Sequence, residues 1–497
     1  MHIDYGLDGF YDEVFAAPGQ PRPHYQSLIR RLGELSERDL DQREHMRDES
    51  FRMLGITFTL GSDLERPFPM DLIPRIIPAR EWTRLEQGLV QRVRALNAFI
   101  DDVYNERHAL HDGIVPWSLV LSCKGYRRQM CGYSPPGGVW AHVAGIDLVR
   151  DGDGEYRVLE DNLRVPSGVS YVLENRGAMS RVFPRMFTDG YRVRPVDVYP
   201  TALRRALGSV STRGRTDPVV VSLTPGIYNS AYFEHVFLAR QMGVELVEGR
   251  DLVVLDHSVF MHTTHGLQRV DVIYRRIDDD FLDPVAFRPD SVLGVPGLLS
   301  AIRAGNVTVA NAIGTGVADD KAIYAFVPDL IRYYLGEKPL INNVQTYLLE
   351  DAEQREHVLS RLDQLVVKAV GEAGGYGMLI GPKASDKDIA DFRRKILADP
   401  RNYIAQEVVA LSRAPVYGKG RVYPAHIDLR PFVVTGAQGS FVLPGGLTRV
   451  ALVEGSLVVN SSQGGGSKDT WVLEKSNVTT STPRQAPILE PAGRGRS

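Results

Sequence analysis

The chain has 497 residues, of which 43% are hydrophobic and 24% are charged, and its 58 basic residues nearly balance its 61 acidic residues. The formal charge of −3 argues against a protein that coats nucleic acid, and the apolar content argues against a disordered acidic chain. Because one compact domain commonly holds about 100–200 residues, this length predicts about two to four structural units.

The two cysteines, Cys123 and Cys131, cannot build a disulfide framework, and their spacing does not match a metal knuckle. The first residues show no basic segment followed by an apolar run, and no apolar stretch is long enough to cross a bilayer. We therefore expect a cytoplasmic protein with neither a membrane nor a nucleic acid as partner. The oligomeric state stays open, and a homo-oligomer is compatible with the sequence.

The N-terminal half predicts a polar arm, a long helix and a strand hairpin. Residues 1–70 are interrupted by Pro and Gly, and we expect them to wrap around the protein with one helix near 34–53. From 78 to about 108, apolar residues recur at three- and four-residue intervals, which predicts an amphipathic helix. Strands are expected at 117–123, 139–149 and 155–161, the last two joined by an Asp-Gly turn at 151–154.

A second unit is expected after a linker-like segment at 206–217. A strand at 218–223, a helix at 231–242 and a strand at 243–247 predict a β-α-β unit and a small α/β domain over about 216–310. The elements expected after it are a helix at 318–336, strands at 364–370 and 378–381, a helix at 384–398, and strands at 403–409, 423–435, 441–443 and 447–453. The Pro/Ser/Thr-rich tail from Ser476 predicts disorder.

The strongest local feature is a lysine followed by glycines between two expected strands. Lys368 alternates with apolar residues, and Gly371, Gly374, Gly375 and Gly377 follow it. A glycine-rich turn lets backbone N–H groups surround phosphate oxygens without obstruction by side chains. The alternative is a flexible hairpin with a lysine at its edge, and this feature alone does not decide between the two. The loop is neither a P-loop nor a dinucleotide fingerprint, because a strand follows it instead of a helix.

A second feature is an acidic hairpin. Glu160 and Asn162 end an apolar strand and would point to one face of it, with Asp161 on the other face. Asp147 lies on the strand expected to pair with it. Three oxygen ligands from one hairpin, completed by water and phosphate oxygens, suit Mg²⁺ bound to a nucleotide. The alternative is a solvated acidic turn, which we prefer for the two aspartates of the turn itself.

Two later strands carry polar residues. The strand at 403–409 contains Gln406 and Glu407, and its backbone could contact an adenine edge while Glu407 reaches a ribose hydroxyl. An ordinary strand is the stronger interpretation until its position after the glycine-rich loop is considered. In the next strand, Asp428 and Arg430 share a face, and Arg430 could stabilise a phosphoryl group in transfer.

Other candidates are weaker. The histidine pairs 108/111 and 262/265 lack the glutamate of a helical zinc motif, and neither cysteine sits in a nucleophile context. No Gly-x-Ser-x-Gly elbow occurs, so hydrolase chemistry through a covalent intermediate is disfavoured. Arg275 and Arg276, followed by three aspartates at 278–280, are either a solvated charge run or a site for a charged substrate.

Together, the lysine strand, the glycine-rich hairpin, the Gln-Glu-Val-Val strand and the acidic metal set resemble the ATP-grasp superfamily, whose two subdomains hold ATP between them. Here Glu160 precedes Lys368, which resembles the circularly permuted arrangement, known also in the synthetase domain of glutathionylspermidine synthetase. The segments at 228–235, 271–280, 316–322 and 465–471 are similar to the circularly permuted type 2 ATP-grasp family, and the resemblance covers about residues 10–475.

The resemblance implies a mixed α+β and α/β fold, a circularly permuted ATP-grasp fold with an additional small α/β domain. The implied units are an arm (1–70), a core part with the metal hairpin (71–215), an α/β substrate domain (216–315), a lid subdomain with the glycine-rich loop (316–420), a return to the core (421–475) and a disordered tail (476–497).

The resemblance also implies roles for individual residues. It assigns Asp147, Glu160 and Asn162 to Mg²⁺. It assigns Lys321 and Lys368 to the phosphates of ATP and, with Arg430, to catalysis. The nucleotide-binding residues that it implies in addition are Gly374, Gly375, Tyr376 and Gly377 in the phosphate lid, and Gln406, Glu407, Val408 and Val409 in the adenine pocket. From spacing alone, Asp319-Asp320-Lys321 would be an ordinary helix start with a solvated lysine.

The activity that follows is that of an ATP-dependent carboxylate–amine ligase, which would form an amide or peptide bond through an acylphosphate. A kinase-like phosphotransferase using the same ATP site and a nucleotide-binding scaffold without turnover remain alternatives. The acceptor site is expected near the 216–310 unit, with Tyr228, Asn229, Glu234, Arg275 and Arg276 as candidate substrate residues. The sequence does not name the carboxylate or the amine.

Overall fold

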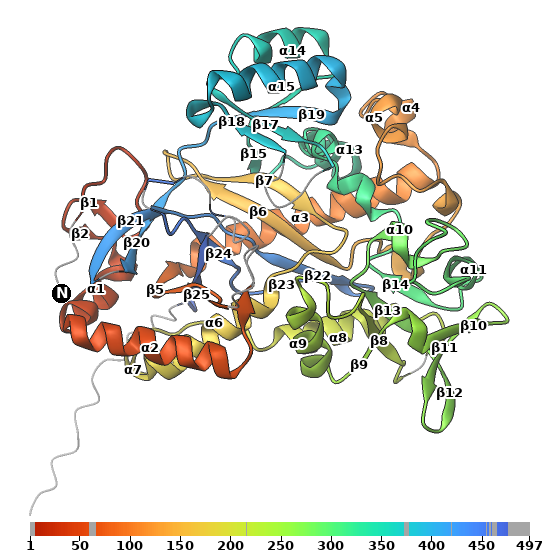
Figure 1. Ribbon diagram of the computed structural model, residues 1–497, viewed down its shortest axis with the longest axis horizontal. Helices are drawn as coiled ribbons and strands as arrows, with labels where there is room; N and C mark the ends of the chain where they lie inside the picture. Colours follow the sequence, from red (N-terminus) through yellow and green to blue (C-terminus); the bar gives the residue numbers. More distant parts are fainter. Residues whose placement is uncertain are drawn as a thin grey trace, which may run out of the picture.

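The computed structural model describes residues 5–58, 66–214, 216–371, 377–418, 420–453, 455–456, 459 and 465–475. They form a mixed α/β fold in which smaller sheets and helices surround a central sheet (Figure 1). In this part of the chain, no helix is both long enough and apolar enough to cross a membrane.

The central sheet joins segments that are far apart in the sequence. Its strands, in order, are β15 (Asn342–Asn343), β7 (Tyr156–Asn162), β6 (Val143–Arg150), β22 (Phe432–Gly436) and β23 (Gly439–Val442). β6 and β7 form the antiparallel hairpin that the Asp-Gly turn predicts, and β22 returns from late in the chain to pair with β6. The sheet therefore brings early and late polar residues together.

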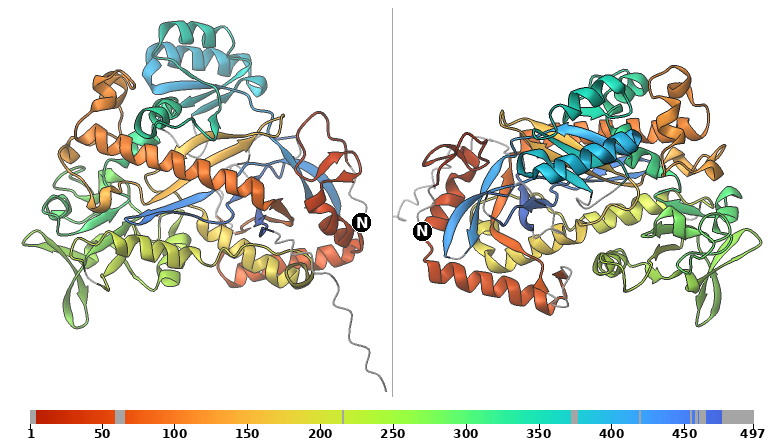
Figure 2. Two further views of the ribbon diagram at one scale, coloured as in Figure 1. Left: turned by 180° about the vertical axis from the view of Figure 1, so that it is seen from behind. Right: turned by 45° about the horizontal axis from the view of Figure 1, so that its top comes forward.

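The long helix α3 (Ala79–Tyr104) packs against the central sheet, as Figure 2 shows from behind. It begins after Pro78, where the fixed φ of proline suits a helix start. The apolar stripe that predicted it is buried: Trp82, Leu85, Leu89, Val93, Leu96, Ile100 and Val103. The periodic pattern thus identified both the helix and its buried face.

A second sheet and the N-terminal arm adjoin the central sheet. The strands of this part are β24 (Thr448–Val450), β25 (Gly466–Val472) and β5 (Met70–Ile77) in one sheet and β20 (Arg413–Gly418) with β21 (Arg421–His426) in a ribbon. The arm contains two helices, α1 (Gln26–Gly33) and α2 (Glu37–Met53), where the sequence predicted one. Buried Glu13 ties the arm to the core by ion pairs with Arg75 and Arg150. The arm also contains the strand pairs β1 (Phe15–Ala17) with β2 (Gln20–Pro21) and β3 (Thr57–Phe58) with β4 (Arg66–Pro67).

The 216–310 segment forms the expected α/β unit around a parallel sheet. Its strands, in order, are β14 (Thr308–Ala310), β13 (Val272–Arg275), β8 (Val220–Leu223) and β9 (Glu245–Val247). Helix α9 (Tyr232–Met242) connects β8 to β9, which confirms the predicted β-α-β unit. The flanking elements are α8 (Tyr199–Ser209), α10 (Asp279–Leu282), α11 (Leu298–Arg303) and the antiparallel strands β10 (Leu252–Leu255), β11 (Ser258–Thr263) and β12 (Gly266–Arg269).

A small antiparallel sheet lies above the β6–β7 hairpin in Figure 1. Its strands, in order, are β16 (Thr346–Leu348), β19 (Tyr403–Glu407), β17 (Leu365–Ala369) and β18 (Met378–Ile380). α14 (Ala352–Leu359) and α15 (Asp386–Ala398) pack with it around a separate apolar core. β17 and β18 pair as the predicted hairpin, while residues 372–376 of its loop lie outside the described residues.

Several expected elements differ. The apolar run 117–123, predicted as a strand, forms helix α5 (Trp117–Leu121), which buries Leu119 and Val120 on one side only. The helix predicted at 318–336 is divided into the 3₁₀ helix η5 (Thr315–Asp319) and the helices α12 (Lys321–Tyr324) and α13 (Val327–Leu335). Helix α8 extends into the segment interpreted as a linker, and the strand predicted at 423–435 is two strands. The elements that the prediction omitted include α4 (His108–His111), α6 (Val169–Val182) and α7 (Pro184–Asp189). The tail from 476 lies outside the described residues.

Candidate active site

The β6–β7 hairpin places the predicted metal residues together. Asp147 lies directly opposite Glu160, and Gly145 lies opposite Asn162, whose side-chain nitrogen donates to the Gly145 carbonyl at 3.2 Å. Asp161 points to the other face, as strand alternation requires, and accepts two hydrogen bonds of 2.6 Å from Arg92 of α3. This buried pair fixes β7 against the long helix.

Asp147 forms a buried ionic cluster. Arg430 donates from Nη2 to its Oδ2 at 2.8 Å, and Arg449 donates to the same oxygen at 2.7 Å. Arg449 also pairs with Asp428, so two carboxylates and two guanidinium groups alternate. Burial alone would raise the pKa of Asp147, but the two arginines outweigh it and hold the pKa well below its ordinary value. Asp147 is therefore ionised at neutral pH.

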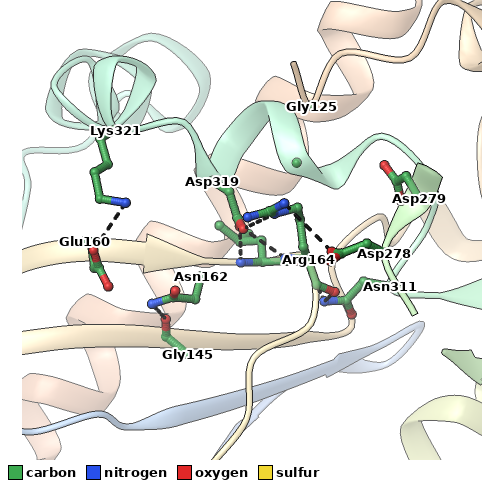
Figure 3. A network of polar contacts seen from close by, with 12 residues as sticks. Gly125, Gly145, Glu160, Asn162, Arg164, Asp278, Asp279, Asn311, Asp319 and Lys321 are labelled. Carbon is green, nitrogen blue, oxygen red and sulfur yellow. Dashed lines mark hydrogen bonds and ion pairs between the residues drawn. The ribbon is translucent and has the colours of Figure 1, made fainter. Parts of the chain in front are cut away.

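Lys321 approaches the hairpin from above, as Figure 3 shows. Its Nζ lies 3.6 Å from Oε2 of Glu160, and Nη2 of Arg430 lies 3.9 Å from Oε1 of the same carboxylate. Asp320 caps α12 by accepting a hydrogen bond of 2.8 Å from the backbone of Ala322, which confirms the predicted helix start. The cap fixes the position from which Lys321 extends.

The small antiparallel sheet contributes Lys368 from β17. Its pKa is lowered to about 8: burial is the largest cause, the charges of Lys321 and Arg449 also lower the pKa, and Glu160 and Asp147 act in the opposite direction. Because these groups affect Lys368, its ammonium group belongs to the same charged region as the hairpin. The structure thus brings Lys321, Lys368, Glu160 and Arg430 into one charged region.

The predicted adenine strand is β19. Gln406 donates to Oγ1 of Thr346 at 3.0 Å, and its buried Oε1 has no hydrogen-bond partner among the described residues. Glu407 accepts hydrogen bonds from the Tyr347 hydroxyl at 2.7 Å and from Arg361 at 3.3 Å. Val408 and Val409 follow the strand and are half-buried. In the predicted lid, Gly377 is described with φ of 64°, whereas Gly374, Gly375 and Tyr376 lie outside the described residues.

The candidate substrate residues of the α/β unit differ in exposure. Tyr228 is 98% exposed, and Asn229 accepts a hydrogen bond from the backbone of Ala231. Glu234 is buried and pairs with Arg276 at 2.9 Å. Arg275 is buried as well, and the partners of its guanidinium are Asp279 and the carbonyls of Asn311, Ile277 and Ala312. Glu234, Arg275 and Arg276 thus make ion pairs and hydrogen bonds within the protein.

Sequence reasoning missed Arg449, Arg164 and Asp319. Arg449 is a buried cation in the short strand β24, and a charged residue within an apolar strand was the available signal. Asp319 was noted only as part of a helix start, but its carboxylate binds Arg164 and the backbone just after Asn162. Both interactions join segments that are far apart in the sequence.

The oxygen atoms at the hairpin fit a metal carried by a nucleotide better than a fully protein-bound metal. Glu160 offers a carboxylate and Asn162 an amide oxygen, while both oxygens of Asp147 accept hydrogen bonds from arginine. Among the described residues, no group of three or more His, Cys, Asp or Glu side chains is placed to hold a metal ion. Mg²⁺ takes few protein ligands when phosphate oxygens complete its shell, and this donor set suits that case.

The chain matches a family model and several known proteins. Residues 74–451 match the family model described as "Circularly permuted ATP-grasp type 2". A Synechocystis sp. protein, named only as uncharacterized, is 57% identical over 475 residues, which cover 95% of this chain and 98% of that protein. A Mycobacterium tuberculosis protein of strain H37Rv, also named as uncharacterized, is 56% identical over 93% of this chain and 84% of its own length.

Two further matches concern ligase-like proteins. A Frankia casuarinae protein named "Putative glutamate--cysteine ligase 2-2" is 47% identical over 93% of this chain, and the chain spans about half of that protein, 53%. Among solved structures, an apo glutathione synthetase-like effector from Globodera pallida aligns with a TM-score of 0.55 at 11% identity, covering 88% of this chain and 98% of that one. At this identity, the structural match shows the fold.

Proposed function

Because the chain belongs to the circularly permuted type 2 ATP-grasp family, we propose that it is an ATP-dependent carboxylate–amine ligase acting in the cytoplasm. The observation that supports this most is the charged region formed by Lys321, Lys368, Glu160 and Arg430, drawn from four separate segments. The ligase name of the Frankia relative agrees with it, although this chain covers only about half of that protein.

The described residues suit the handling of a triphosphate. Lys321 and Lys368 would neutralise its negative charge, and Glu160 with Asn162 would hold the magnesium ion that it carries, with Asp147 as a further ligand once Arg430 turns to the phosphate. Oε1 of Gln406, which has no hydrogen-bond partner in the described part of the chain, would accept from the adenine amino group. Mg²⁺ supplies charge neutralisation at the transferred phosphoryl group.

The proposed reaction needs no protein nucleophile. The substrate carboxylate attacks the γ-phosphorus and ADP leaves, which gives an acylphosphate. An amine then attacks the acyl carbon, phosphate leaves with the electrons of the C–O bond and takes the proton that the nitrogen loses, and an amide forms. Arg430, whose Nη2 lies 3.9 Å from Oε1 of Glu160, would stabilise the phosphoryl group during transfer. Positioning and charge neutralisation would therefore carry the rate enhancement.

The test is substrate-dependent ADP release with pooled carboxylates and amines, followed by mass analysis of the product. Glu160→Gln is expected to abolish magnesium-dependent turnover, while Glu155→Gln, an exposed change in the same hairpin, leaves it intact. Unchanged turnover in Glu160→Gln would remove the metal assignment. A phosphorylated product formed without any amine would indicate a phosphotransferase instead, and nucleotide binding without ADP release from any combination would indicate a scaffold.

A further inference from the structure

The loop after the predicted metal residue Asn162 holds an arginine in a fixed position. Asp319 accepts hydrogen bonds from the backbone N–H groups of Leu163 and Arg164, the second at 3.1 Å, and its other oxygen accepts from Nε of Arg164 at 2.7 Å. Figure 3 shows the guanidinium group beside Asp319, along the strand from Glu160 and Asn162. One carboxylate thus fixes both the backbone and the side chain of Arg164.

The aliphatic part of Arg164 is also confined. It crosses Gly316, where an added Cβ would lie 2.9 Å from Cδ of Arg164. Gly125 packs against the same backbone, since a Cβ at Gly125 would lie 2.3 Å from the carbonyl carbon of Gly316. Two glycines in close contact therefore leave a narrow path for the arginine. A side chain ordered in this way loses little conformational entropy when it binds a ligand.

The terminal nitrogens of Arg164 form an ion pair with Asp278 but no hydrogen bond to any described residue. Nη1 lies 3.8 Å from Oδ1 of Asp278, which is too long for a hydrogen bond, and Nη2 has no partner among the described residues. The side chain of Arg164 is 36% exposed and that of Asp278 is 56% exposed. Within the described part of the chain, a fixed guanidinium group therefore presents to solvent an edge that makes an ion pair with a carboxylate but no hydrogen bond.

Asp278 is a helix N-cap residue whose side chain does not cap the helix. It occupies the N-cap of α10, where an aspartate usually accepts a hydrogen bond from the backbone of the first turn. Here its side chain makes no capping bond and turns toward Arg164 instead (Figure 3). Helix α10 therefore lacks the stabilisation that a side-chain cap would provide. The carboxylate instead faces the same solvent region as the guanidinium group.

The position of this pair relates it to the proposed reaction. Asp278 follows β13 and Asp319 lies beyond β14, so both come from the carboxyl-terminal edge of the parallel sheet. In open parallel sheets, ligands bind at this edge. Arg164 lies two residues after Asn162, which places the pair next to the proposed magnesium and phosphate site.

From these features we infer that Arg164 and Asp278 bind a zwitterionic α-amino acid, which is the amine substrate of the ligase; this inference rests on the proposed function. The α-carboxylate binds the Nη edge of Arg164, and the α-ammonium binds Asp278. The ammonium transfers one proton to Asp278, the freed nitrogen forms the C–N bond with the acyl carbon, and phosphate leaves with the electrons of the C–O bond and takes the second proton from that nitrogen. Asp278 then returns the proton to water.

The experiment uses the full chain with magnesium and the non-hydrolysable analogue AMP-PNP, and it measures calorimetrically the binding of each of the 20 common L-amino acids. We expect at least one to bind, and its carboxamide and its N-acetyl form to bind about tenfold more weakly or worse. Arg164→Met and Asp278→Asn are each expected to weaken binding about tenfold and to leave the affinity for AMP-PNP within about twofold.

The decisive readout is the loss of discrimination. Arg164→Met should bind the amino acid and its carboxamide equally, which a merely structural role for the arginine would not produce. Arg288→Met and Asp290→Asn provide matched controls. These two residues form an exposed ion pair at 2.7 Å that is not part of the proposed site. No amino acid binding to an enzyme that binds AMP-PNP, or unchanged affinity and discrimination in both variants, would overturn the inference. Absence of AMP-PNP binding would instead defeat the proposed function.

Discussion

Lys321 and Glu160 face each other across the candidate site, with Nζ of the lysine 3.6 Å from Oε2 of the carboxylate. The lysine begins a short helix, and the glutamate lies near the end of β7. In the proposed complex with magnesium and ATP, the two groups exchange this contact for stronger ones. Lys321 then contacts phosphate and Glu160 contacts the metal ion.

The first prediction concerns Lys321. Lys321→Met removes one cation from the phosphate site, and we expect the affinity for magnesium and AMP-PNP to fall about 10- to 100-fold, the range for a lost hydrogen bond to a charged group. Titration calorimetry measures the change. Lys387→Met, at an exposed position of α15, is the matched control and should bind as the unaltered protein does. Equal affinity in the two variants would show that Lys321 does not contact the nucleotide.

The second prediction concerns the pH dependence caused by Lys368, whose pKa is about 8 in the ligand-free protein. Bound phosphates favour the charged ammonium and raise this pKa, so nucleotide binding takes up a proton. Affinity is then highest below pH 8, where Lys368 is already charged, and it falls as the pH rises above 8. We expect binding of AMP-PNP to be about tenfold weaker at pH 9 than at pH 7.

Lys368→Arg provides the comparison for this prediction. Arginine stays charged throughout this range, so the variant should show a flat profile between pH 7 and pH 9. Binding measured in buffers of different ionisation enthalpy should also show proton uptake by the unaltered protein near pH 8. A flat profile for the unaltered protein, or an identical slope in both proteins, contradicts the assignment of Lys368 to the phosphates.

The third prediction concerns stability. Lys468 is fully buried, pairs with Asp71 and donates to the carbonyl oxygens of Ile73 at 3.0 Å and of Pro415 at 2.6 Å. It thereby joins β25, β5 and β20. Lys468→Met leaves a buried carboxylate without its cation, and we expect the free energy of unfolding to fall by about 3–5 kcal/mol. Urea unfolding measures this, with the exposed change Lys475→Met as control; equal midpoints would refute a stabilising role.

Local patterns predicted the parts of the site that depend on one element. Alternation in β7 placed Glu160 and Asn162 on one face and Asp161 on the other, because successive side chains of a strand point to opposite sides. The pairing of β17 with β18 was also predicted locally, from the glycines between the two strands. The periodicity of apolar residues in α3 likewise predicted that helix and its buried face, but not its partners.

Contacts between segments far apart in the chain produce no local pattern in the sequence from which they could be predicted. The cluster of Asp147, Arg430 and Arg449 depends on strands that meet only in the folded chain, and Arg449 appeared in the sequence as one polar residue among apolar ones. The pairing of Lys468 with Asp71 is of the same kind. The short apolar run at 117–123 was predicted wrongly as a strand, because so short a run does not distinguish a helix from a strand by periodicity.

The last prediction separates structure from substrate binding at Glu234. Its Oε2 accepts hydrogen bonds from the backbone of Gly168 at 2.7 Å and of Ser170 at 3.0 Å and from the Ser170 hydroxyl at 2.9 Å, while Oε1 pairs with Arg276. Because the carboxylate is buried and its hydrogen-bonding capacity is occupied, Glu234→Ala should lower the free energy of unfolding by about 3–5 kcal/mol.

Glu234→Gln then distinguishes the two roles. It keeps the shape of the side chain and can still accept from Gly168 and Ser170, but it loses the charge that balances Arg276, so we expect a lower unfolding temperature with an unchanged KM for the amine. Glu245→Gln, an exposed change on β9, should leave both quantities unaltered. If Glu234→Gln unfolds at the original temperature and raises KM instead, Glu234 contacts substrate, and the loop at 168–170 is held by other groups.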